Sequence, residues 1–364
     1  MGLEIEFLPT GDDSGDAIII REGTALTGYT IYNVDGGYAS TSDTIINHIE
    51  KYYGRDVSIN HMVLSHADDD HATGLIKVLE RFHVDNLWMN RPWLFVDEVI
   101  QHFHGNYTRD GLYKDMRDLH PYLIQLEELV AKKNKQSLFK TNINHVFQGS
   151  QIGSFTVLAP SRERYIRLIP ELPKTPKNYS ADSATGTLLG GLFTEAKKKV
   201  AEYIDEKWNI ETLSSNPQPP TNASNETSVV QLGRFGKRSI LLTADAGPEA
   251  LNEAADYAQM LGMLAPPTFV QVPHHGSRHN VTPEVLDRWL GARVPEGTKY
   301  GTAYVSVGAK RLGHPRGQVS NAFLRRGYPV HTVRTLAKRY SFDMDDRKDW
   351  VDSVPEPFKT EVEA

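Results

Sequence analysis

The stretch HADDDH, residues 66–71, places two histidines and three aspartates within six positions, directly after the segment HMVL at 61–64. Adjacent carboxylates repel one another and are costly to bury, so an acidic run of this kind is usually a solvated loop. The flanking histidines favour another interpretation, because alternating carboxylates and imidazoles suit divalent metal ions. From Thr73 onward apolar residues recur at helical spacing. The cluster is therefore predicted to lie where a strand leads into a helix.

The composition of the 364-residue chain limits what the protein can be. Hydrophobic residues make up 39% and charged residues 24%, as in a soluble globular protein. Cysteine is absent, which excludes disulfides and thiolate ligands, so a metal site must be built from His, Asp, Glu, Asn and water. The net charge of −6 argues against a broad basic surface but leaves room for a local basic patch.

No segment of the sequence indicates a membrane or an export signal. The apolar runs have the length of strands and are too short to span a bilayer. The N-terminal MGLEIEF lacks the basic region and the apolar region of a signal peptide. We therefore expect a cytoplasmic protein that does not bind a membrane.

Strand-like and helix-like segments fall into two groups along the chain. The N-terminal forty residues predict short strands joined by turns, followed by a helix at 41–53 and a largely helical stretch at 91–134. Strands resume in HVFQGSQIGSFTVLAP at 145–160. The hairpin SVVQLGRFGKRSILLTAD at 228–245 opens the second group, in which strands and helices alternate as far as VHTVRT at 330–335.

The stretch between the two groups is irregular. Residues 161–227 combine a basic helix-like piece, FTEAKKKVAEYIDEKW at 193–208, with a polar run at 214–228 that is typical of a flexible loop. Two β-rich groups, each covered by helices, predict an α/β fold: a four-layer αββα sandwich over residues 1–345. The stretch at 161–227 is a mainly helical and loop insertion between the halves. The acidic tail at 346–364 is expected to fray.

Residue types that bind metals follow three of the strand-like segments. After HMVLS, SILLTA and PTFVQVP come, in that order, His66, Asp68, Asp70 and His71, then Asp245, then His274 and His275. An aspartate after a strand is more often a turn or helix-cap residue, and a lone histidine is usually structural. Three such groups in one chain nevertheless predict a metal site. Two divalent ions about 4 Å apart can share a carboxylate and lower the pKa of bound water from about 15.7 towards about 7.

These motifs carry a resemblance to a known family. HADDDH matches the H-x-[HD]-x-D-H signature of the metallo-β-lactamase superfamily, and VDGG (34–37), LLTAD (241–245) and VPHHGS (272–277) follow its order of motifs. Three further stretches resemble the soluble metallo-β-lactamase-like domain of ComEC-type competence proteins and their phosphorylcholine-esterase-like relatives. They are FLPTGDDSGDAIII (7–20), NETSVV (225–230) and SVGAKRLGHP (306–315). The resemblance implies a metallo-β-lactamase sandwich with a hydrolytic metal centre.

The resemblance also implies which residues hold two metal ions. A first position takes His66 and Asp68, a second takes Asp70, His71 and His275, and Asp245 bridges the two. Asp68 stands where most members carry a histidine, and Asn225 is nearest to the place of another histidine that is absent here. A carboxylate is a harder ligand than imidazole, so the expected ions are zinc or manganese, with magnesium as an alternative.

Other residues are implied to act around the ions. His274 would face the phosphate or the leaving group of the substrate, and Asp35 would hold the signature loop through hydrogen bonds. His314 would bind phosphate or donate a proton, with loop packing as an equal alternative for it and for Asn225. Further candidates for substrate contact are Asn225, Ser228, Arg278, His279, Lys310 and Arg311.

The basic residues near these motifs allow two interpretations. One group lies beside the Gly-His-Pro motif and another follows HHGS: Lys310, Arg311 and Arg316, then Arg278 and His279. These side chains either bind phosphate or are ordinary solvated residues. The basic residues on the hairpin turn at 234–238 and the lysines at 197–199 are interpreted as plain surface.

The preferred functional hypothesis is a metal-dependent phosphodiesterase, most of all a nuclease, that uses a metal-bound hydroxide. Asp70, His274 and His314 are its catalytic candidates, and its partner is a nucleic acid or a small phosphodiester. One alternative is hydrolysis of a small phosphodiester, such as a phosphocholine or cyclic-nucleotide ester, or of another ester. The other alternative is a degenerate member of the family whose metal centre only stabilises a binding scaffold.

Overall fold

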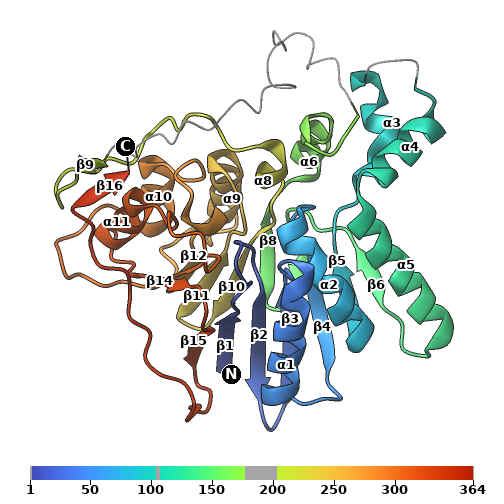
Figure 1. Ribbon diagram of the computed structural model, residues 1–364, viewed down its shortest axis with the longest axis horizontal. Helices are drawn as coiled ribbons and strands as arrows, with labels where there is room; N and C mark the ends of the chain where they lie inside the picture. Colours follow the sequence, from blue (N-terminus) through green and yellow to red (C-terminus); the bar gives the residue numbers. More distant parts are fainter. Residues whose placement is uncertain (1, 104–106, 177–202, 364) are drawn as a thin grey trace.

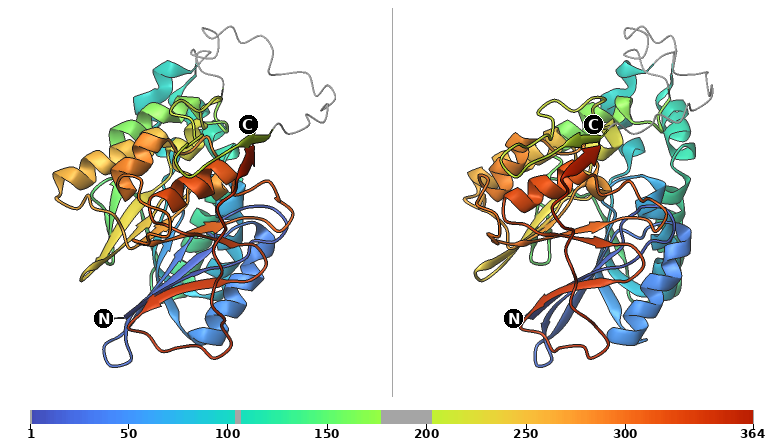
Figure 2. Two further views of the ribbon diagram at one scale, coloured as in Figure 1. Left: turned by 90° about the vertical axis from the view of Figure 1, so that its left-hand side faces the viewer. Right: turned by 60° about the vertical axis from the view of Figure 1, so that its left-hand side comes forward.

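The computed structural model describes residues 2–103, 107–176 and 203–363. Within these ranges two seven-stranded sheets pack face to face, and helices cover the outer face of each (Figure 1 and Figure 2). One group of buried apolar side chains, including Phe7, Phe155 and Phe269, fills the space between the sheets. Two further groups lie between each sheet and its helices. The predicted four-layer αββα sandwich is confirmed.

The first sheet contains the N-terminal strands in the order β15-β1-β2-β3-β4-β5-β6. Antiparallel pairing joins β15 through β3, and parallel pairing joins β3 through β6. The strand bounds are β1 Gly2–Phe7, β2 Ile18–Thr24, β3 Gly28–Val34, β4 Ser58–Val63, β5 His83–Trp88, β6 Asn142–Asn144 and β15 Lys338–Phe342.

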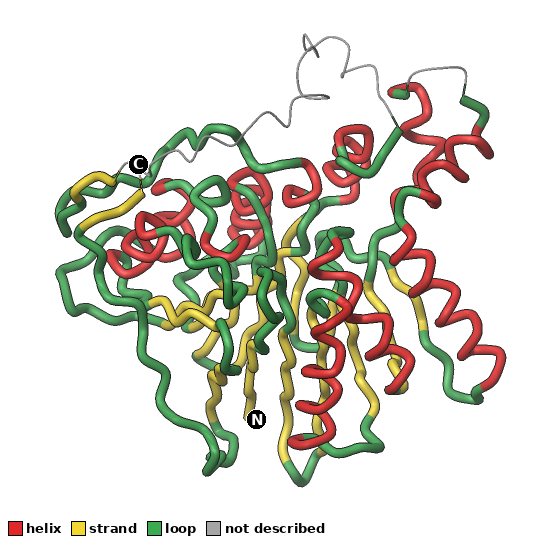
Figure 3. The backbone as a smooth tube through the Cα atoms, in the orientation of Figure 1, coloured by secondary structure: helices red, strands yellow, loops and turns green. Residues whose placement is uncertain are grey.

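The helices of the first half cover the outer face of this sheet, and Figure 3 shows them beside the strands. Their bounds are α1 Ser42–Tyr52, α2 Asp69–Arg81, α3 Val96–Val99, α4 Arg109–Asp118 and α5 Pro121–Gln136. The helix predicted at 41–53 corresponds to α1. Two aspartates, Asp69 and Asp70, lie in the first turn of α2, where the positive end of the helix dipole stabilises carboxylates.

The second sheet has the order β14-β13-β12-β11-β10-β8-β7. Its strands are β7 Gln151–Ile152, β8 Phe155–Ala159, β10 Val230–Phe235, β11 Arg238–Leu242, β12 Phe269–Gln271, β13 Thr302–Ser306 and β14 Val330–Val333. Helices α6 Arg162–Leu168, α8 Ala223–Glu226, α9 Pro248–Met260, α10 Pro283–Leu290 and α11 Gly317–Arg325 belong to this half. None of the helices in the described ranges is long and apolar enough to cross a membrane.

Two features of the chain path go beyond what the sequence predicts. Strand β15 comes late in the sequence but pairs with β1, which closes the edge of the first sheet. The irregular stretch leaves the second sheet after β8 and returns at β10, and these two strands are neighbours. The piece 193–208, expected to be helical, is described only from residue 203, where β9 (Tyr203–Asp205) is a strand. The lysines at 197–199 lie outside the described residues.

The C-terminal residues pack against the sandwich, although the sequence predicts that they fray. Strand β16 (Glu361–Glu363) pairs with β9, and Val362 is buried. Arg347 forms ion pairs with Glu4, at 2.9 Å, and with Glu6. Both glutamates are fully buried in β1, and a buried carboxylate requires a cationic partner. Arg347, a basic residue in this mostly acidic tail, therefore supplies positive charge to the buried glutamates of the first sheet.

Candidate metal centre

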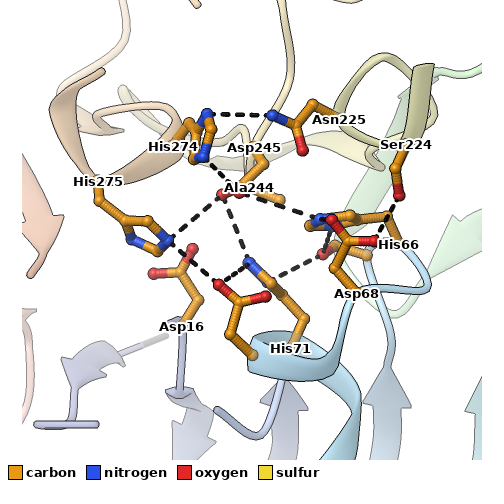
Figure 4. A network of polar contacts seen from close by, with 12 residues as sticks. Asp16, His66, Asp68, His71, Ser224, Asn225, Ala244, Asp245, His274 and His275 are labelled. Carbon is orange, nitrogen blue, oxygen red and sulfur yellow. Dashed lines mark hydrogen bonds and ion pairs between the residues drawn. The ribbon is translucent and has the colours of Figure 1, made fainter. Parts of the chain in front are cut away.

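The ligand candidates come together at one edge of the sandwich, where loops from both sheets meet (Figure 4). The loop after β4 and the first turn of α2 bring one group, and the loop after β11 brings Asp245. The histidine pair lies in the short 3-10 helix η5 (His274–Gly276), after β12. The six predicted metal ligands and His274, which is predicted to face the substrate, join one network of close contacts: His66, Asp68, Asp70, His71, Asp245, His274 and His275.

Asp245 lies at the centre of this network, and four imidazoles direct their Nε2 atoms towards its buried carboxylate. Oδ1 is 3.5 Å from His71 Nε2 and 4.0 Å from His275 Nε2. Oδ2 is 3.9 Å from His66 Nε2 and 3.5 Å from His274 Nε2. These separations are longer than ordinary hydrogen bonds. The two oxygens face two different pairs of imidazoles, which is the geometry expected of a carboxylate shared by two ions.

The other ring nitrogen of each histidine has a fixed partner, which determines the tautomer. His71 Nδ1 lies 2.8 Å from Asp35 Oδ2, an acceptor, so Nδ1 carries the proton. The Ser65 hydroxyl donates to the same Asp35 oxygen over 2.6 Å and must therefore accept from His66 Nδ1 at 3.0 Å. In both histidines the lone pair is on Nε2, which faces the centre.

The histidine pair in η5 follows the same rule. His275 Nδ1 donates to the carbonyl of Ser306 over 3.0 Å. Asn280 donates its amide to the carbonyl of Asp245 over 2.8 Å, so its Oδ1 accepts from His274 Nδ1 at 2.8 Å. All four imidazoles consequently present Nε2 towards the centre, each supported from behind by a hydrogen bond.

The residues present fit divalent metal ions. Nε2 of His66, His71 and His275 and Oδ1 of Asp245 are buried and have no hydrogen-bond partner among the described residues. Buried polar atoms without a partner are rare because each costs stability. Ligand atoms of His66, His71 and Asp245 lie within 4.8 Å of one another, as do those of Asp70, His71 and His275. Imidazoles and carboxylates at these positions form two adjoining donor sets.

The electrostatics of the centre attract cations. Burial alone would lower the pKa of a histidine, but the surrounding carboxylates, Asp245 foremost, raise the pKa of His71 well above its usual 6.5 and that of His275 to about 9. Burial would raise the pKa of Asp245, yet the neighbouring imidazoles hold it well below the usual 3.8. The carboxylates thus stay ionised and favour positive charge between them, whether carried by protons or by metal ions.

Four residues in the ligand loops have an energetically unfavourable backbone conformation. Asp35, Ala244, His274 and His275 have φ values of 56°, 45°, 44° and 55°, in the left-handed region that non-glycine residues rarely adopt. Asp35 accepts hydrogen bonds from Ser65 N at 2.8 Å and from the side chains described above, so it has the structural role expected from the sequence. Such residues cost about 1–3 kcal/mol each and cluster at functional sites.

Asp68 completes the first metal position from the outer side. Its Oδ2 lies 3.6 Å from His66 Nε2, and its Oδ1 accepts a hydrogen bond of 2.7 Å from Ser224. Burial would raise the pKa of Asp68, but His66 and Ser224 outweigh it and lower that pKa. The carboxylate is therefore charged and oriented, as a ligand must be.

The structure corrects two of the predicted substrate contacts. Asn225 is buried, donates to the Thr221 hydroxyl over 2.8 Å and lies 3.1 Å from His274 Nδ1. The amide nitrogen of Asn225 and the protonated Nδ1 of His274 are both donors, so Asn225 packs against His274 and anchors its loop through Thr221. Ser228 has no exposed surface, and its amide is bonded to the carbonyl of Asn225. Both side chains are enclosed, Asn225 in α8 and Ser228 two residues before β10, so neither is placed to contact a substrate.

The predicted residues beyond HHGS and at the Gly-His-Pro motif lie beside the centre. A Cβ on Gly276 would meet the Cβ of Pro315 at 2.3 Å, so the two loops touch where glycine is needed. His314 is half-buried, and burial together with nearby cationic groups lowers its pKa to about 4. His279 is also half-buried, beside Arg278, and its pKa is likewise lowered, first by burial. Both imidazoles are neutral at pH 7.

The exposed cations of the Gly-His-Pro loop are already paired. Lys310 lies 2.6 Å from Asp12, and Arg311 lies 2.8 Å from Asp13. Backbone hydrogen bonds from Ala309 and Lys310 to the 11–12 turn hold these two loops together. Exposed pairs of this kind are weak, so both cations remain able to exchange partners.

Sequence reasoning missed one residue of the centre. Asp16, which precedes β2, is buried and has a carboxylate oxygen within 4.8 Å of ligand atoms of Asp245 and His275. The signal was present in the N-terminal motif, because Asp16 is the aspartate of GDAIII (15–20). An aspartate that precedes a strand is not by itself a ligand signal, and only the tertiary structure brings Asp16 to the centre.

Two packed sheets, outer helices and a His/Asp cluster at the edge where the loops meet define a metallo-β-lactamase fold with a candidate two-metal centre. No family model matches the chain, and no curated protein matches it. Solved structures similar to it include the metallo-beta-lactamase fold protein YhfI from Bacillus subtilis, with 10% identity over 94% of this chain and all of that one and a TM-score of 0.43.

Two other solved structures are similar at the same level. Tm1679, described as a metal-dependent hydrolase of the beta-lactamase superfamily, is 13% identical over 93% of this chain and 100% of its own, with a TM-score of 0.42. A mutant of the CmlA beta-hydroxylase is 12% identical over 93% of this chain and 54% of its own, with a TM-score of 0.43. Identities this low transfer no activity to the present chain.

Proposed function

We propose that this protein is a metal-dependent hydrolase of phosphodiester bonds. The observation that carries the proposal is the convergence of four Nε2 lone pairs on the carboxylate of Asp245. Divalent ions held there would supply a nucleophile at neutral pH by acidifying water and would neutralise charge on a phosphate. The motif order, which resembles that of phosphoester hydrolases, favours phosphate over a lactam or a thioester.

The chain's own residues have distinct roles in this proposal. Asp70 is partly exposed at the mouth of the centre, with Oδ2 3.7 Å from His275 Nε2 and 3.9 Å from His71 Nε2. It can orient a water and hold its proton. The His274 side chain is 33% exposed, more than the other three imidazoles, so it can reach a phosphate or a leaving group. The neutral His314 can donate a hydrogen bond to a phosphate oxygen.

The charged side chains around the centre bear on whether the substrate is a polymer or a small molecule. Lys310 and Arg311 are paired with Asp12 and Asp13, and Lys174 is paired with Asp69 next to the ligands. A nuclease needs cations that replace the counterions of a long polyanion. A small phosphodiester needs only the metal centre and a few hydrogen bonds. The paired carboxylates reduce the net positive charge beside the centre, even though the cations can exchange partners, so a small diester is a second candidate beside a nucleic acid.

The decisive experiment is hydrolysis of bis-p-nitrophenyl phosphate by purified protein with added Mn²⁺ or Zn²⁺. We expect metal-dependent turnover that falls more than about a hundredfold in Asp70→Asn. Asp69→Asn is the matched control, because Asp69 neighbours Asp70 but pairs with Lys174 instead. Its turnover should stay within about threefold. Folded, metal-loaded protein that hydrolyses no phosphodiester would refute the proposal.

A substrate panel then separates the two candidates. DNA, RNA, cyclic nucleotides and phosphocholine esters would be compared at two salt concentrations. Cleavage of polymers that weakens steeply with salt indicates a nuclease. Turnover of small diesters alone, with little dependence on salt, indicates the second candidate.

A further inference from the structure

Asp16 is a buried carboxylate beneath the metal centre that none of the roles above uses. Only 2% of the residue is exposed. One of its oxygens groups with ligand atoms of Asp245 and His275 within 4.8 Å, and the residue also groups with Asp35 and His71 within the same distance. Figure 4 shows its carboxylate below His275, on the side of the centre that faces the first sheet.

Gln271 fixes the orientation of this carboxylate. Its Oε1 accepts hydrogen bonds from the backbone N–H groups of Thr243 and Ala244, each at 3.0 Å. The amide can therefore face Asp16 only with Nε2, which donates to Asp16 Oδ2 over 2.9 Å. The carbonyl of Asp16 in turn accepts from Gly37 N at 2.7 Å. Oδ2 is thus held by Gln271, the carboxylate also interacts with the Ser306 side chain, and one of its oxygens lies within 4.8 Å of ligand atoms of Asp245 and His275.

The neighbouring atoms of His275 and Asp245 indicate that a ligand binds next to Asp16. His275 Nε2 and Asp245 Oδ1 are both buried and have no hydrogen-bond partner among the described residues. The Nδ1 of His275 is engaged by Ser306, so its free lone pair is on Nε2. Asp16 and Asp245 are two buried carboxylates with ligand atoms within 4.8 Å of each other, and such a pair is strongly disfavoured unless the carboxylates share positive charge. The ligand atoms of Asp16, Asp245 and His275 therefore lie close enough together to share one metal ion.

We propose that Asp16 is a further carboxylate ligand of the second metal position and that Gln271 is its positioning residue. The donor set of that position is then Asp16, Asp70, His71, Asp245 and His275. Three oxygen and two nitrogen donors suit a six-coordinate ion such as Mn²⁺ better than tetrahedral Zn²⁺. The inference rests on the proposed metal centre and is independent of the chemistry of the substrate.

The test is calorimetric and EPR titration of metal-free protein with Mn²⁺. The unmutated chain should bind two ions, and Asp16→Asn should weaken one of them by about a hundredfold. Asp12→Asn is the matched control, because this exposed residue lies on the turn just before Asp16 and pairs with Lys310. We expect its Mn²⁺ affinities to stay within about twofold.

Thermal melting separates a ligand from a merely structural residue. Asparagine keeps an acceptor for Gln271 Nε2 and puts no charge into the buried site, so metal-free Asp16→Asn should be at least as stable as the unmutated protein, while the rise in Tm with Mn²⁺ shrinks. A structural role would lower the Tm of the metal-free protein and leave Mn²⁺ affinity unchanged, which would overturn the proposal. If the variant fails to fold, a crystal structure of the unmutated chain with Mn²⁺ decides, because an Asp16 oxygen must lie within bonding distance of the ion.

Failure of this inference can be told from failure of the proposed function. Asp16-dependent Mn²⁺ binding by a protein that cleaves no phosphodiester would support the ligand and refute the phosphodiesterase. If the protein cleaves phosphodiesters but Asp16→Asn leaves its Mn²⁺ affinities unchanged, the phosphodiesterase is supported and the ligand role of Asp16 is refuted. A chain that binds no Mn²⁺ would overturn the ligand assignment.

Discussion

Two regions in which this protein buries several charges differ in how those charges are satisfied. On the outer face of the first sheet, Glu4 and Glu6 of β1 are fully buried, and the chain supplies their partners. Glu4 is paired with Arg21, Arg339 and Arg347 at 2.7–2.9 Å. At the loop edge of the sandwich, by contrast, buried imidazole and carboxylate atoms face one another at 3.5–4.0 Å without hydrogen bonds.

This difference separates structure from function. A buried carboxylate with two or three cationic partners is complete, and its role is to hold strands and the C-terminal segment together. A buried carboxylate that faces four imidazole Nε2 atoms without hydrogen bonds needs positive charge between them, which either protons or metal ions must supply. Buried carboxylates thus mark an ion-pair network where arginines face them and a candidate metal centre where imidazole nitrogens face them.

The largest effect should come from the shared carboxylate. Asp245→Asn removes the charge that both metal positions use, so we expect metal affinity and turnover to fall by more than about a hundredfold. Calorimetric titration and the phosphodiester assay measure the two losses. Asp256→Asn, on the exposed surface of α9, should change neither. Metal binding that survives Asp245→Asn would remove the basis of the comparison.

The ion-pair network should respond in stability and not in metal binding. Arg347→Met leaves Glu4 and Glu6 buried with one cation fewer, and we expect a loss of about 3 kcal/mol in the free energy of unfolding. Urea denaturation measures it, with the exposed neighbour Lys348→Met as the control. A loss below about 1 kcal/mol, or a matching loss of metal affinity, would contradict the separation of the two regions.

Asp35 links the signature loop to the metal ligands and should have an intermediate effect. Asp35→Asn keeps the shape of the side chain but removes the charged acceptor of the His71 Nδ1 proton. Metal affinity should fall by about 10–100-fold while the chain stays folded. Asp43→Asn, an exposed residue of α1 paired with Lys77, is the control. Equal affinities in the two variants would show that orientation of His71 is unimportant.

The smallest effect expected is a dependence of stability on pH. Burial would raise the pKa of Glu6, but His48, Arg347 and Tyr53 outweigh it and lower that pKa below the usual 4.5. A depressed carboxyl pKa contributes stability above about pH 4.5, and this contribution is lost as the pH falls through the folded-state value. Urea denaturation at pH 7, 5 and 4 should therefore show a smaller acid loss in Glu6→Gln than in the exposed-site control Glu80→Gln. Parallel acid losses would refute this.

Much of the fold and of the centre could be predicted from local patterns. Apolar runs ending in turn residues mark the strands, and helical spacing from Thr73 marks α2, because both depend on neighbouring residues only. The ligand groups follow strand ends, and strand ends in a layered α/β sandwich collect at one edge. Their tautomers depend on Ser65, Asn280 and Ser306, which no local pattern singles out.

The rest depended on contacts between residues far apart in the chain. Whether β15 pairs with β1, whether Arg347 reaches Glu4, and whether Lys310 meets Asp12 are decided by the packing of the sheets and loops. Asp16 and Gln271 likewise meet across the two sheets, 255 positions apart in the sequence. The sequence by itself determined which segments become strands and helices and which motifs end them. Only the tertiary structure decided which buried charges find partners in the chain, because pairing requires proximity that short-range patterns do not encode.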